Sequence, residues 1–155
     1  MKKTITLSRL VLVAVFFVCT SAVKPDDNTQ TAGIKFFDGC YEDALAAAKK
    51  QNKLIFIDAY TSWCGPCRLL KANTFTDKRV GDYFNEHFIC LAYNTEKDEG
   101  IKIADKYKIT RFPTMIIADG NGNRVTFTVG YISPSDLISF GRYGAQKALQ
   151  MKLFP

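Results

Sequence analysis

Residues 54–57 constrain the fold more than any other part of this chain, because Leu-Ile-Phe-Ile is an apolar run without polar alternation. A strand with one solvated face alternates apolar and polar side chains, whereas a strand covered on both faces does not. We therefore predict a central, buried parallel strand over residues 53–60. Residues 88–93 form a second strand of this kind. Two such strands favour an α/β fold with helices on both faces of the sheet.

Helical spacing and turn residues predict the remaining elements. Apolar residues recur at i, i+3, i+4 and i+7 from Tyr41, and Asp38 is placed to cap that helix. Further helices are expected near Pro66, over 78–87 and 96–107, and from Ser133, and further strands over 34–37, 114–118 and 124–129. The Asn-Gly pair within 119–123 predicts a hairpin. This order indicates one domain, residues 34–150, with an antiparallel hairpin at the edge of the sheet.

The first 22 residues have the layout of a secretory signal peptide. Lys2, Lys3 and Arg9 are basic, residues 10–18 are apolar, and residues 20–22 are small, as at a cleavage site. The apolar run is far shorter than the about 20 residues that span a bilayer, so we expect no stable membrane insertion. The sequence predicts an exported protein, periplasmic or secreted.

Cys19 allows a second interpretation of this leader, namely lipid attachment at a new N-terminus. The residues before it, 16–18, are bulky where a lipoprotein signal has leucine followed by small residues, which favours plain export. Cleavage after Ala22 removes Cys19. The polar residues 23–33 that follow predict a flexible tether.

The net charge excludes one class of partner. The formal charge of the chain is +6, and the leader contains three basic and no acidic residues, so +3 remains after its removal. No cluster of lysine and arginine accompanies this excess, whereas a nucleic-acid-binding surface requires one. We expect a solvated surface and no nucleic-acid partner.

Two cysteines close together are the main candidates for chemistry. Cys64 follows the predicted strand 53–60 and precedes a predicted helix. Unpaired N–H groups and the dipole at a helix start stabilise a thiolate, which is the form that attacks disulfides. The carboxyl end of a strand is also where open α/β sheets place their sites. We expect Cys64 to be the attacking residue, with an exposed sulfur.

Cys67 lies one helical turn after Cys64, so the pair can form a disulfide and Cys67 can resolve a mixed disulfide. Gly65 lets another chain approach closely, and Pro66 stiffens the turn. The alternative is a structural zinc site, which usually needs two such pairs. The chain offers one pair and one histidine, His87, which we expect at the surface or in packing. We predict a redox pair with no metal and no bound cofactor.

The run Trp63-Cys64-Gly65-Pro66-Cys67 resembles the active-site run of thioredoxin. Asp58, six residues earlier, matches the buried aspartate of that family. Phe112-Pro113-Thr114 matches its cis-proline segment, and Gly130 matches a glycine after the last strand. The resemblance covers about residues 34–145 and implies the thioredoxin fold, a central mixed sheet with helices on both faces.

Two further runs resemble one particular branch of the thioredoxin family. Residues 74–77 with Val80, and residues 119–122, are similar to the thioredoxin-like C-terminal domains of transmembrane disulfide reductases and to their single-domain exported relatives. This implies a thiol–disulfide oxidoreductase, a reductase or isomerase of exported protein substrates. It also implies a monomer that receives electrons from a membrane or soluble donor protein. The alternative is a thioredoxin-fold binding module or chaperone with incidental redox activity.

The resemblance implies a role for each matching residue. Asp58 accepts the proton of Cys67, and burial raises its pKa; a structural aspartate that caps a loop is the alternative. If Pro113 is cis, the backbone of Phe112 pairs with an extended substrate. Trp63 shields the cysteine pair and offers an apolar surface. The substrate-binding set is Trp63, Gly65, Pro66, Phe112, Pro113 and Gly130.

The chain departs from thioredoxin at three places. The lysine often found near the buried aspartate is missing, and Ala92 occupies about its position. Phe112 is larger than the usual aliphatic residue before the proline. Cys40 and Cys90 are additional; we place them at opposite ends of the sheet and expect no bond between them, with Cys90 buried.

Overall fold

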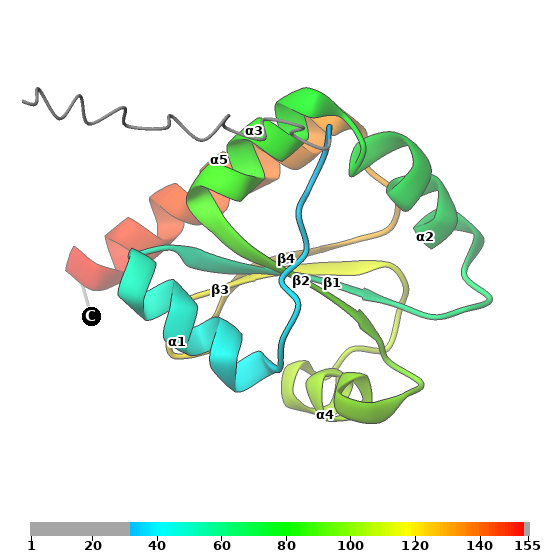
Figure 1. The fold of residues 1–155 in the computed structure, drawn as a ribbon, viewed down its shortest axis with the longest axis horizontal. Helices are drawn as coiled ribbons and strands as arrows, with labels where there is room; N and C mark the ends of the chain where they lie inside the picture. The colour runs from blue at the N-terminus through cyan, green and yellow to red at the C-terminus, as the bar shows by residue number, and fades with distance from the viewer. Residues whose placement is uncertain (1–31, 154–155) are drawn as a thin grey trace, which may run out of the picture.

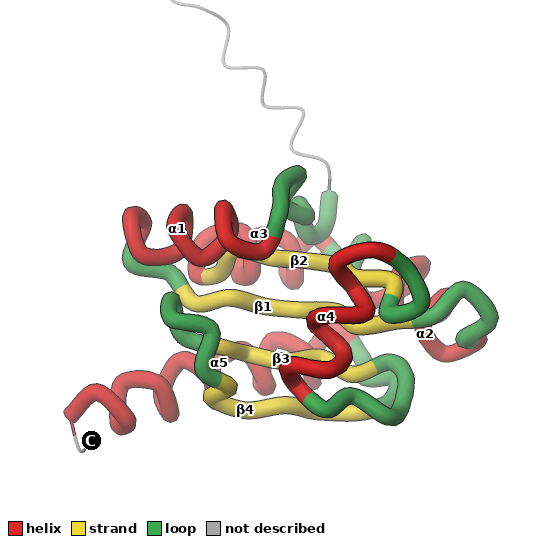
Figure 2. Tube along the Cα trace, turned by 90° about the horizontal axis from the view of Figure 1, so that it is seen from below, coloured by secondary structure: helices red, strands yellow, loops and turns green. Residues whose placement is uncertain are grey.

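A computed structural model describes residues 32–153, which form a four-stranded mixed sheet. Its strands, in spatial order, are β2 (Phe88–Asn94), β1 (Leu54–Tyr60), β3 (Thr114–Ala118) and β4 (Arg124–Val129). β1 pairs with β2 in parallel and with β3 antiparallel, and β4 forms a hairpin with β3. Figure 2 shows the strands side by side in this order. The mixed sheet and its late hairpin are thus confirmed.

Helices cover both faces of the sheet (Figure 1). On one face lie α1 (Tyr41–Gln51) and α4 (Asp98–Tyr107). On the other lie α2 (Gly65–Leu69), the π-helical turn η1 (Leu70–Thr74), α3 (Lys78–His87) and α5 (Pro134–Leu153). The predicted helices are all present, and Pro66 lies in the first turn of α2, where its missing N–H is not needed.

β1 contributes to two hydrophobic cores, because successive side chains of a strand point to opposite faces. Ile55 and Ile57 pack in the core beneath α1 and α4. Phe56 packs in the core beneath α3 and α5. All three side chains are fully buried. The absence of polar alternation in this strand is therefore explained by cover on both sides.

The predicted first strand over 34–37 is wrong. Only one bridge forms there, between Phe36 and Cys90, with the Phe37 N–H donating to the Cys90 carbonyl. The preceding N–H groups have other partners, since Ile34 donates to the Phe75 carbonyl and Lys35 to Asn85 Oδ1. A ladder with β2 does not extend further because these donors are bonded to the helical layer.

Asp38 does not cap α1, contrary to the prediction. The N-cap residue is Cys40, whose side chain makes no capping hydrogen bond. The carboxylate of Glu99, on α4, accepts the N–H of Tyr41 at 3.0 and 3.1 Å instead. The positive end of a helix dipole is stabilised by any nearby carboxylate, whether or not it is close in the sequence. The carboxylate of Glu99 therefore takes the place of the local cap that Asp38 was expected to provide.

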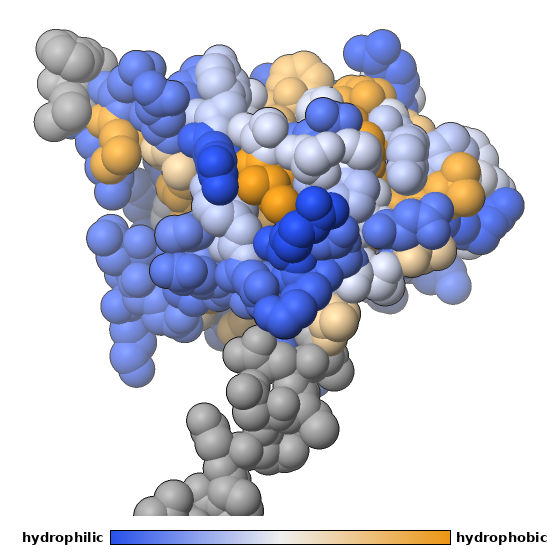
Figure 3. All heavy atoms as spheres, turned by 90° about the horizontal axis from the view of Figure 1, so that it is seen from above, coloured by the Kyte–Doolittle hydropathy of each residue, from blue (hydrophilic) through white to orange (hydrophobic). Residues whose placement is uncertain are grey.

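The predicted signal peptide, Cys19 and most of the predicted tether lie outside the described residues. Gly33 is described and contacts α3, since Asn85 Nδ2 donates to its carbonyl at 3.0 Å. Within residues 32–153, no helix combines the length and the apolar character needed to cross a membrane. On the face drawn in Figure 3, apolar residues form small separate patches among hydrophilic ones.

Gly81 lets the N-terminal segment approach α3 closely. A Cβ at this position would lie 2.3 Å from the Gly33 carbonyl oxygen, which is too close for any side chain. We expect Gly81→Ala to lower the free energy of unfolding by about 1–3 kcal/mol, measured by urea denaturation. Gly65→Ala is the matched control, because nothing closer than 4.0 Å faces a Cβ there. Equal unfolding midpoints for the two variants would contradict the packing argument.

Candidate active site

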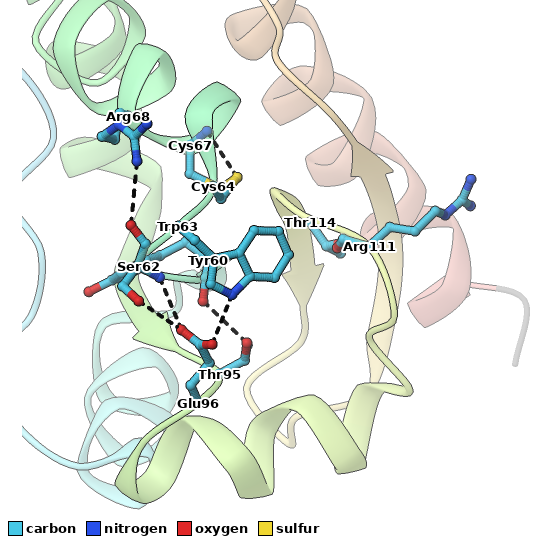
Figure 4. The surroundings of a disulfide bond; sticks show 10 residues. All are labelled: Tyr60, Ser62, Trp63, Cys64, Cys67, Arg68, Thr95, Glu96, Arg111 and Thr114. Carbon is cyan, nitrogen blue, oxygen red and sulfur yellow. Dashed lines mark hydrogen bonds between the residues drawn. A yellow bond between two sulfur atoms is a disulfide. The ribbon is translucent and has the colours of Figure 1, made fainter.

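The cysteine pair lies where β1 ends and α2 begins (Figure 4). Cys64 is the N-cap residue of α2 in an extended backbone conformation, and its carbonyl accepts the N–H of Arg68. The loop before it is closed by the Cys64 N–H, which donates to the Thr61 carbonyl. The strand and the helix therefore hold Cys64 from both sides at the carboxyl end of β1.

Cys64 and Cys67 form a disulfide with an S–S distance of 2.04 Å, which confirms the predicted pairing. The backbone N–H of Cys67 donates to the Cys64 sulfur at 3.2 Å. This N–H is one of the first-turn donors that have no partner within a helix. The same donor is available to a Cys64 thiolate after reduction, and it favours the negative sulfur.

The prediction of an exposed Cys64 sulfur is wrong for the disulfide form. Cys64 is 4% exposed and Cys67 is 2% exposed. The residue that projects into solvent is Trp63, at 66%. Its indole ring packs edge-on against Phe112 with ring centroids 6.0 Å apart. An aromatic pair therefore stands beside a nearly buried disulfide.

Glu96 holds the active-site loop and was missed in the sequence. Its carboxylate accepts the Trp63 indole N–H at 2.9 Å, and the backbone N–H and the hydroxyl of Ser62 at 3.1 and 3.0 Å (Figure 4). These hydrogen bonds, led by the one from the Ser62 N–H, lower the pKa of Glu96. The sequence placed Glu96 inside a helix, whereas α4 begins at Asp98 and leaves it in the connection after β2. No local pattern marks such a contact.

Removing the Glu96 carboxylate is expected to free the Trp63 side chain. Trp63 is the only tryptophan, so its fluorescence reports on this loop alone. In Glu96→Ala we expect lower anisotropy and faster quenching by acrylamide, because the indole N–H loses its acceptor. Glu96→Gln keeps an acceptor oxygen and should lie between Glu96→Ala and the wild type. Identical quenching in all three proteins would show that the carboxylate does not hold the ring.

Asp58 is fully buried on β1, and neither carboxylate oxygen has a hydrogen-bond partner within the described residues. Burial raises its pKa to about 7, and the positive charge of Lys71 opposes this rise. The alternative of a loop-capping aspartate fails, because a cap would be hydrogen-bonded to the loop. Asp58 is thus a buried carboxyl that changes protonation near neutral pH.

The cis-proline segment directly precedes β3, the strand that pairs with β1. The Phe112–Pro113 peptide bond is cis, which confirms the expectation from the resemblance. The Pro113 carbonyl accepts the N–H of Gly130 at 2.8 Å, so the start of β3 and the end of β4 are joined there. Gly130 has φ = +95°, a conformation that side chains rarely adopt, although no atom within 4 Å would meet a Cβ. Its requirement for glycine is therefore conformational.

Cys40 and Cys90 are not bonded to each other, Cys90 is buried and His87 lies at the surface, as predicted. Cys40 and Cys90 are both free, and Cys90 is buried, which raises the pKa of its thiol. The Cys40 thiol is exposed and donates to Asp43 at 3.1 Å. His87 is exposed, with its ring beside that of Tyr83. Over residues 32–153, no three histidine, cysteine or acidic side chains group as metal ligands would.

Comparisons with known proteins agree with this geometry. Residues 41–145 match the family described as a thioredoxin-like domain. A thioredoxin from Echinococcus granulosus is 33% identical over 99 residues, which are 64% of this chain and 83% of that protein. A thioredoxin 2 from Chlorobaculum tepidum is 30% identical over 68% of this chain and 90% of its own length.

Solved structures extend the comparison. A Bacteroides thetaiotaomicron protein provisionally assigned as a disulphide-isomerase is 36% identical with a TM-score of 0.65, covering 75% of this chain and 96% of that one. The oxidised C-terminal domain of DsbD from Neisseria meningitidis shares the fold at 19% identity and a TM-score of 0.56, covering 66% and 90%. With the Cys64–Cys67 disulfide at the start of α2, these matches show that the chain belongs to the thioredoxin-like family and is a thiol–disulfide oxidoreductase.

Proposed function

We propose that this protein reduces or isomerises disulfides in exported proteins, with Cys64 as the attacking residue and Cys67 as the resolving residue. The observation that carries the proposal is the hydrogen bond from the Cys67 N–H to the Cys64 sulfur at the start of α2. A helix start stabilises a thiolate, and only the thiolate attacks a disulfide. The sulfur that receives this hydrogen bond is therefore the one prepared for attack.

The reaction balances without a cofactor. In the reduced enzyme, the Cys64 thiolate attacks a substrate disulfide, and one substrate sulfur leaves as a thiolate. Cys67 then gives its proton to the Asp58 carboxylate, directly or through water, and attacks the Cys64 sulfur. This step breaks the mixed disulfide, expels the second substrate sulfur and closes the Cys64–Cys67 disulfide. Two electrons have passed from the enzyme dithiol to the substrate.

The substrate surface is assigned to the residues around the disulfide. Trp63 is exposed and Phe112 is half-buried, and their rings are in contact. This aromatic pair suits an apolar stretch of polypeptide. The backbone of Phe112 beside Pro113 is available to an extended chain, in the manner of an added strand. Gly65, Pro66 and Gly130 complete the set, because the two glycines have no side chain and the proline ring is compact, which leaves room for a second chain.

Export, domain limits and partners belong to the same proposal. The leader 1–22 supports export, residues 23–32 act as a tether that ends at the packed Gly33, and residues 34–150 form the catalytic domain. The fold shared with the C-terminal domain of DsbD supports an electron-donor protein as the redox partner of the Cys64–Cys67 pair. We propose that the protein works as a monomer.

The direction of electron flow is tested by equilibrating the Cys64–Cys67 pair with glutathione. A reduction potential near about −270 mV supports a reductase, and one near about −120 mV contradicts this by indicating an oxidase. Substrate attack is tested separately with Cys67→Ser, which should accumulate a mixed disulfide at Cys64 with a reducible protein. Cys64→Ser should accumulate none. Trapping through the Cys67 sulfur in Cys64→Ser, and not through Cys64, would reverse the assignment of the two roles.

A further inference from the structure

β4 is an edge strand whose outer side is open. Among the described residues, β3 lies on one side of β4 and no strand lies on the other, as Figure 2 shows. The Gly130 N–H donates to the Pro113 carbonyl, so every second residue back to Thr126 points its backbone groups toward β3. Phe127 and Val129 therefore point their N–H and carbonyl groups away from the sheet. Within residues 32–153, no backbone hydrogen bond from another segment reaches these groups.

The side chains along this edge are also incompletely covered. Phe127 is the register partner of Ile116, which is buried in the core beneath α1 and α4. The two helices cover Ile116 but leave Phe127 49% exposed at the margin of the sheet. An open edge strand with an exposed apolar side chain is a site for pairing with another chain. Such edges are commonly protected by lysine or proline, and residues 125–129 contain neither.

A hollow of about 150 Å³ lies beside Phe127, and the charged residues that line it are all basic, namely Lys108, Arg111 and Arg124. Lys108 is paired with Asp105 at 2.8 Å. The Arg124 guanidinium group lies 5.0 Å from the centre of the Phe127 ring, and Arg111 is exposed. Neither arginine forms an ion pair among the described residues. Two uncompensated positive charges beside an open strand therefore favour an acidic partner.

The hollow adjoins the proposed substrate surface. Arg111 directly precedes the cis-proline segment, and the register partners Thr114 and Val129 line the hollow next to it. Figure 4 shows the Arg111 side chain extending away from the cysteine pair. The hydrogen bond between Gly130 and Pro113 joins this segment to the end of β4. A polypeptide that passes over Pro113 and Gly130 therefore reaches the open edge of β4 at Val129.

We propose that the outer edge of β4 is a second docking subsite for the protein substrate, and that it takes an extended segment with acidic side chains. This inference rests on the proposed function and adds to it a preference for disulfides flanked by carboxylates. The segment adds to β4 through the backbone of Phe127 and Val129, in the manner of an extra strand. Its carboxylates lie beside Arg111 and Arg124. A second copy of this chain fits less well, because it would bring the same positive charges to the same edge.

Docking is tested without redox chemistry, using a short cysteine-free peptide of alternating glutamate and threonine. A peptide with lysine in place of glutamate is its control. In the oxidised full chain, the acidic peptide should slow hydrogen exchange of the Phe127 and Val129 N–H groups by at least about threefold, as followed by NMR. The N–H groups of Thr126 and Thr128 point toward β3, so their exchange should change less. The basic peptide should protect none of them.

The charge preference is tested in the reduction assay with two substrates that carry either glutamates or lysines beside the same disulfide. Arg111→Gln should lower kcat/KM for the glutamate substrate about two- to fivefold, because one exposed charge pair is lost. It should not lower kcat/KM for the lysine substrate. Arg142→Gln is the matched control, since Arg142 is also exposed and lies 5.8 Å from an aromatic ring, that of Tyr83, but on α5. It should leave both substrates unchanged.

No protection of Phe127 and Val129 by either peptide overturns the docking subsite. Equal protection by both peptides, or an unchanged kcat/KM of Arg111→Gln for the glutamate substrate, overturns the preference for acidic segments. Protection that rises with protein concentration in the absence of peptide would assign the edge to a second copy and overturn the proposal as well. The exchange measurement needs no catalysis, so an inactive wild type would refute the proposed function and leave the test of β4 intact.

Discussion

Cys64→Ser is expected to lower the rate of protein-disulfide reduction by at least about 1,000-fold, the usual loss when the nucleophile of a covalent mechanism is removed. Serine has nearly the same shape, but its hydroxyl stays protonated at neutral pH and does not attack sulfur. The hydrogen bond from the Cys67 N–H can then no longer stabilise an anion at this position. The rate is measured as insulin reduction with dithiothreitol as the electron source.

Cys40→Ser is the matched control for this prediction. Cys40 is a free, exposed thiol that also precedes a helix, so it tests whether any accessible cysteine is sufficient. We expect Cys40→Ser to retain the wild-type rate. If Cys64→Ser remained active, or if Cys40→Ser lost activity to the same extent, catalysis through the Cys64–Cys67 pair would be refuted. A binding module with incidental redox chemistry would then be the better description.

The stability of the oxidised protein should fall as the pH rises from 4 to 8, because of Asp58. In the unfolded chain an aspartate loses its proton near pH 4, whereas burial keeps Asp58 protonated up to about pH 7 in the folded protein. Between these values the unfolded chain binds fewer protons than the folded one, so the free energy of unfolding decreases with pH. A pKa raised by about three units corresponds to about 4 kcal/mol.

Asp58→Asn removes this dependence, since asparagine does not titrate. Relative to the wild type, the variant should gain about 4 kcal/mol of unfolding free energy between pH 4 and pH 8, as measured by urea denaturation of the disulfide form. Asp82→Asn is the control, because Asp82 is exposed and paired with Lys78 at the surface. Parallel pH curves for Asp58→Asn and the wild type would show that Asp58 ionises at the same pH in the folded and unfolded states.

The parts of the fold that could be predicted from sequence are those with a local cause. Residues 54–57 lack polar alternation because both faces of β1 are covered, and the run 119–123 turns a hairpin by its own backbone preferences. The cysteine pair was found for the same reason, since a strand end, a helix start and the spacing of Cys64 and Cys67 are all visible in the sequence. The roles given to the surrounding residues stay predictions until the variants are measured.

The failures have a shared cause, namely contacts between segments distant in the sequence. Residues 34–37 do not extend as a strand because their N–H groups bond to the helical layer. Asp38 does not cap α1, because the first N–H of this helix donates to Glu99, a residue of α4 that is distant in the sequence. Glu96 was missed because it reaches Ser62 and Trp63 from a connection that shows no chemical motif.

The connection between β2 and α4, together with the first turn of α4, is hydrogen-bonded to three separate parts of the molecule. Thr95 donates its N–H to the carbonyl of Tyr60 at the end of β1. The Glu96 carboxylate accepts hydrogen bonds from Ser62 and Trp63. The Glu99 carboxylate, on α4, accepts the first N–H of α1. A single proteolytic cut between Glu96 and Asp98 would therefore loosen the redox loop and the opposite helical layer in one event. The rate at which a protease cleaves this peptide therefore reports how often these hydrogen bonds open.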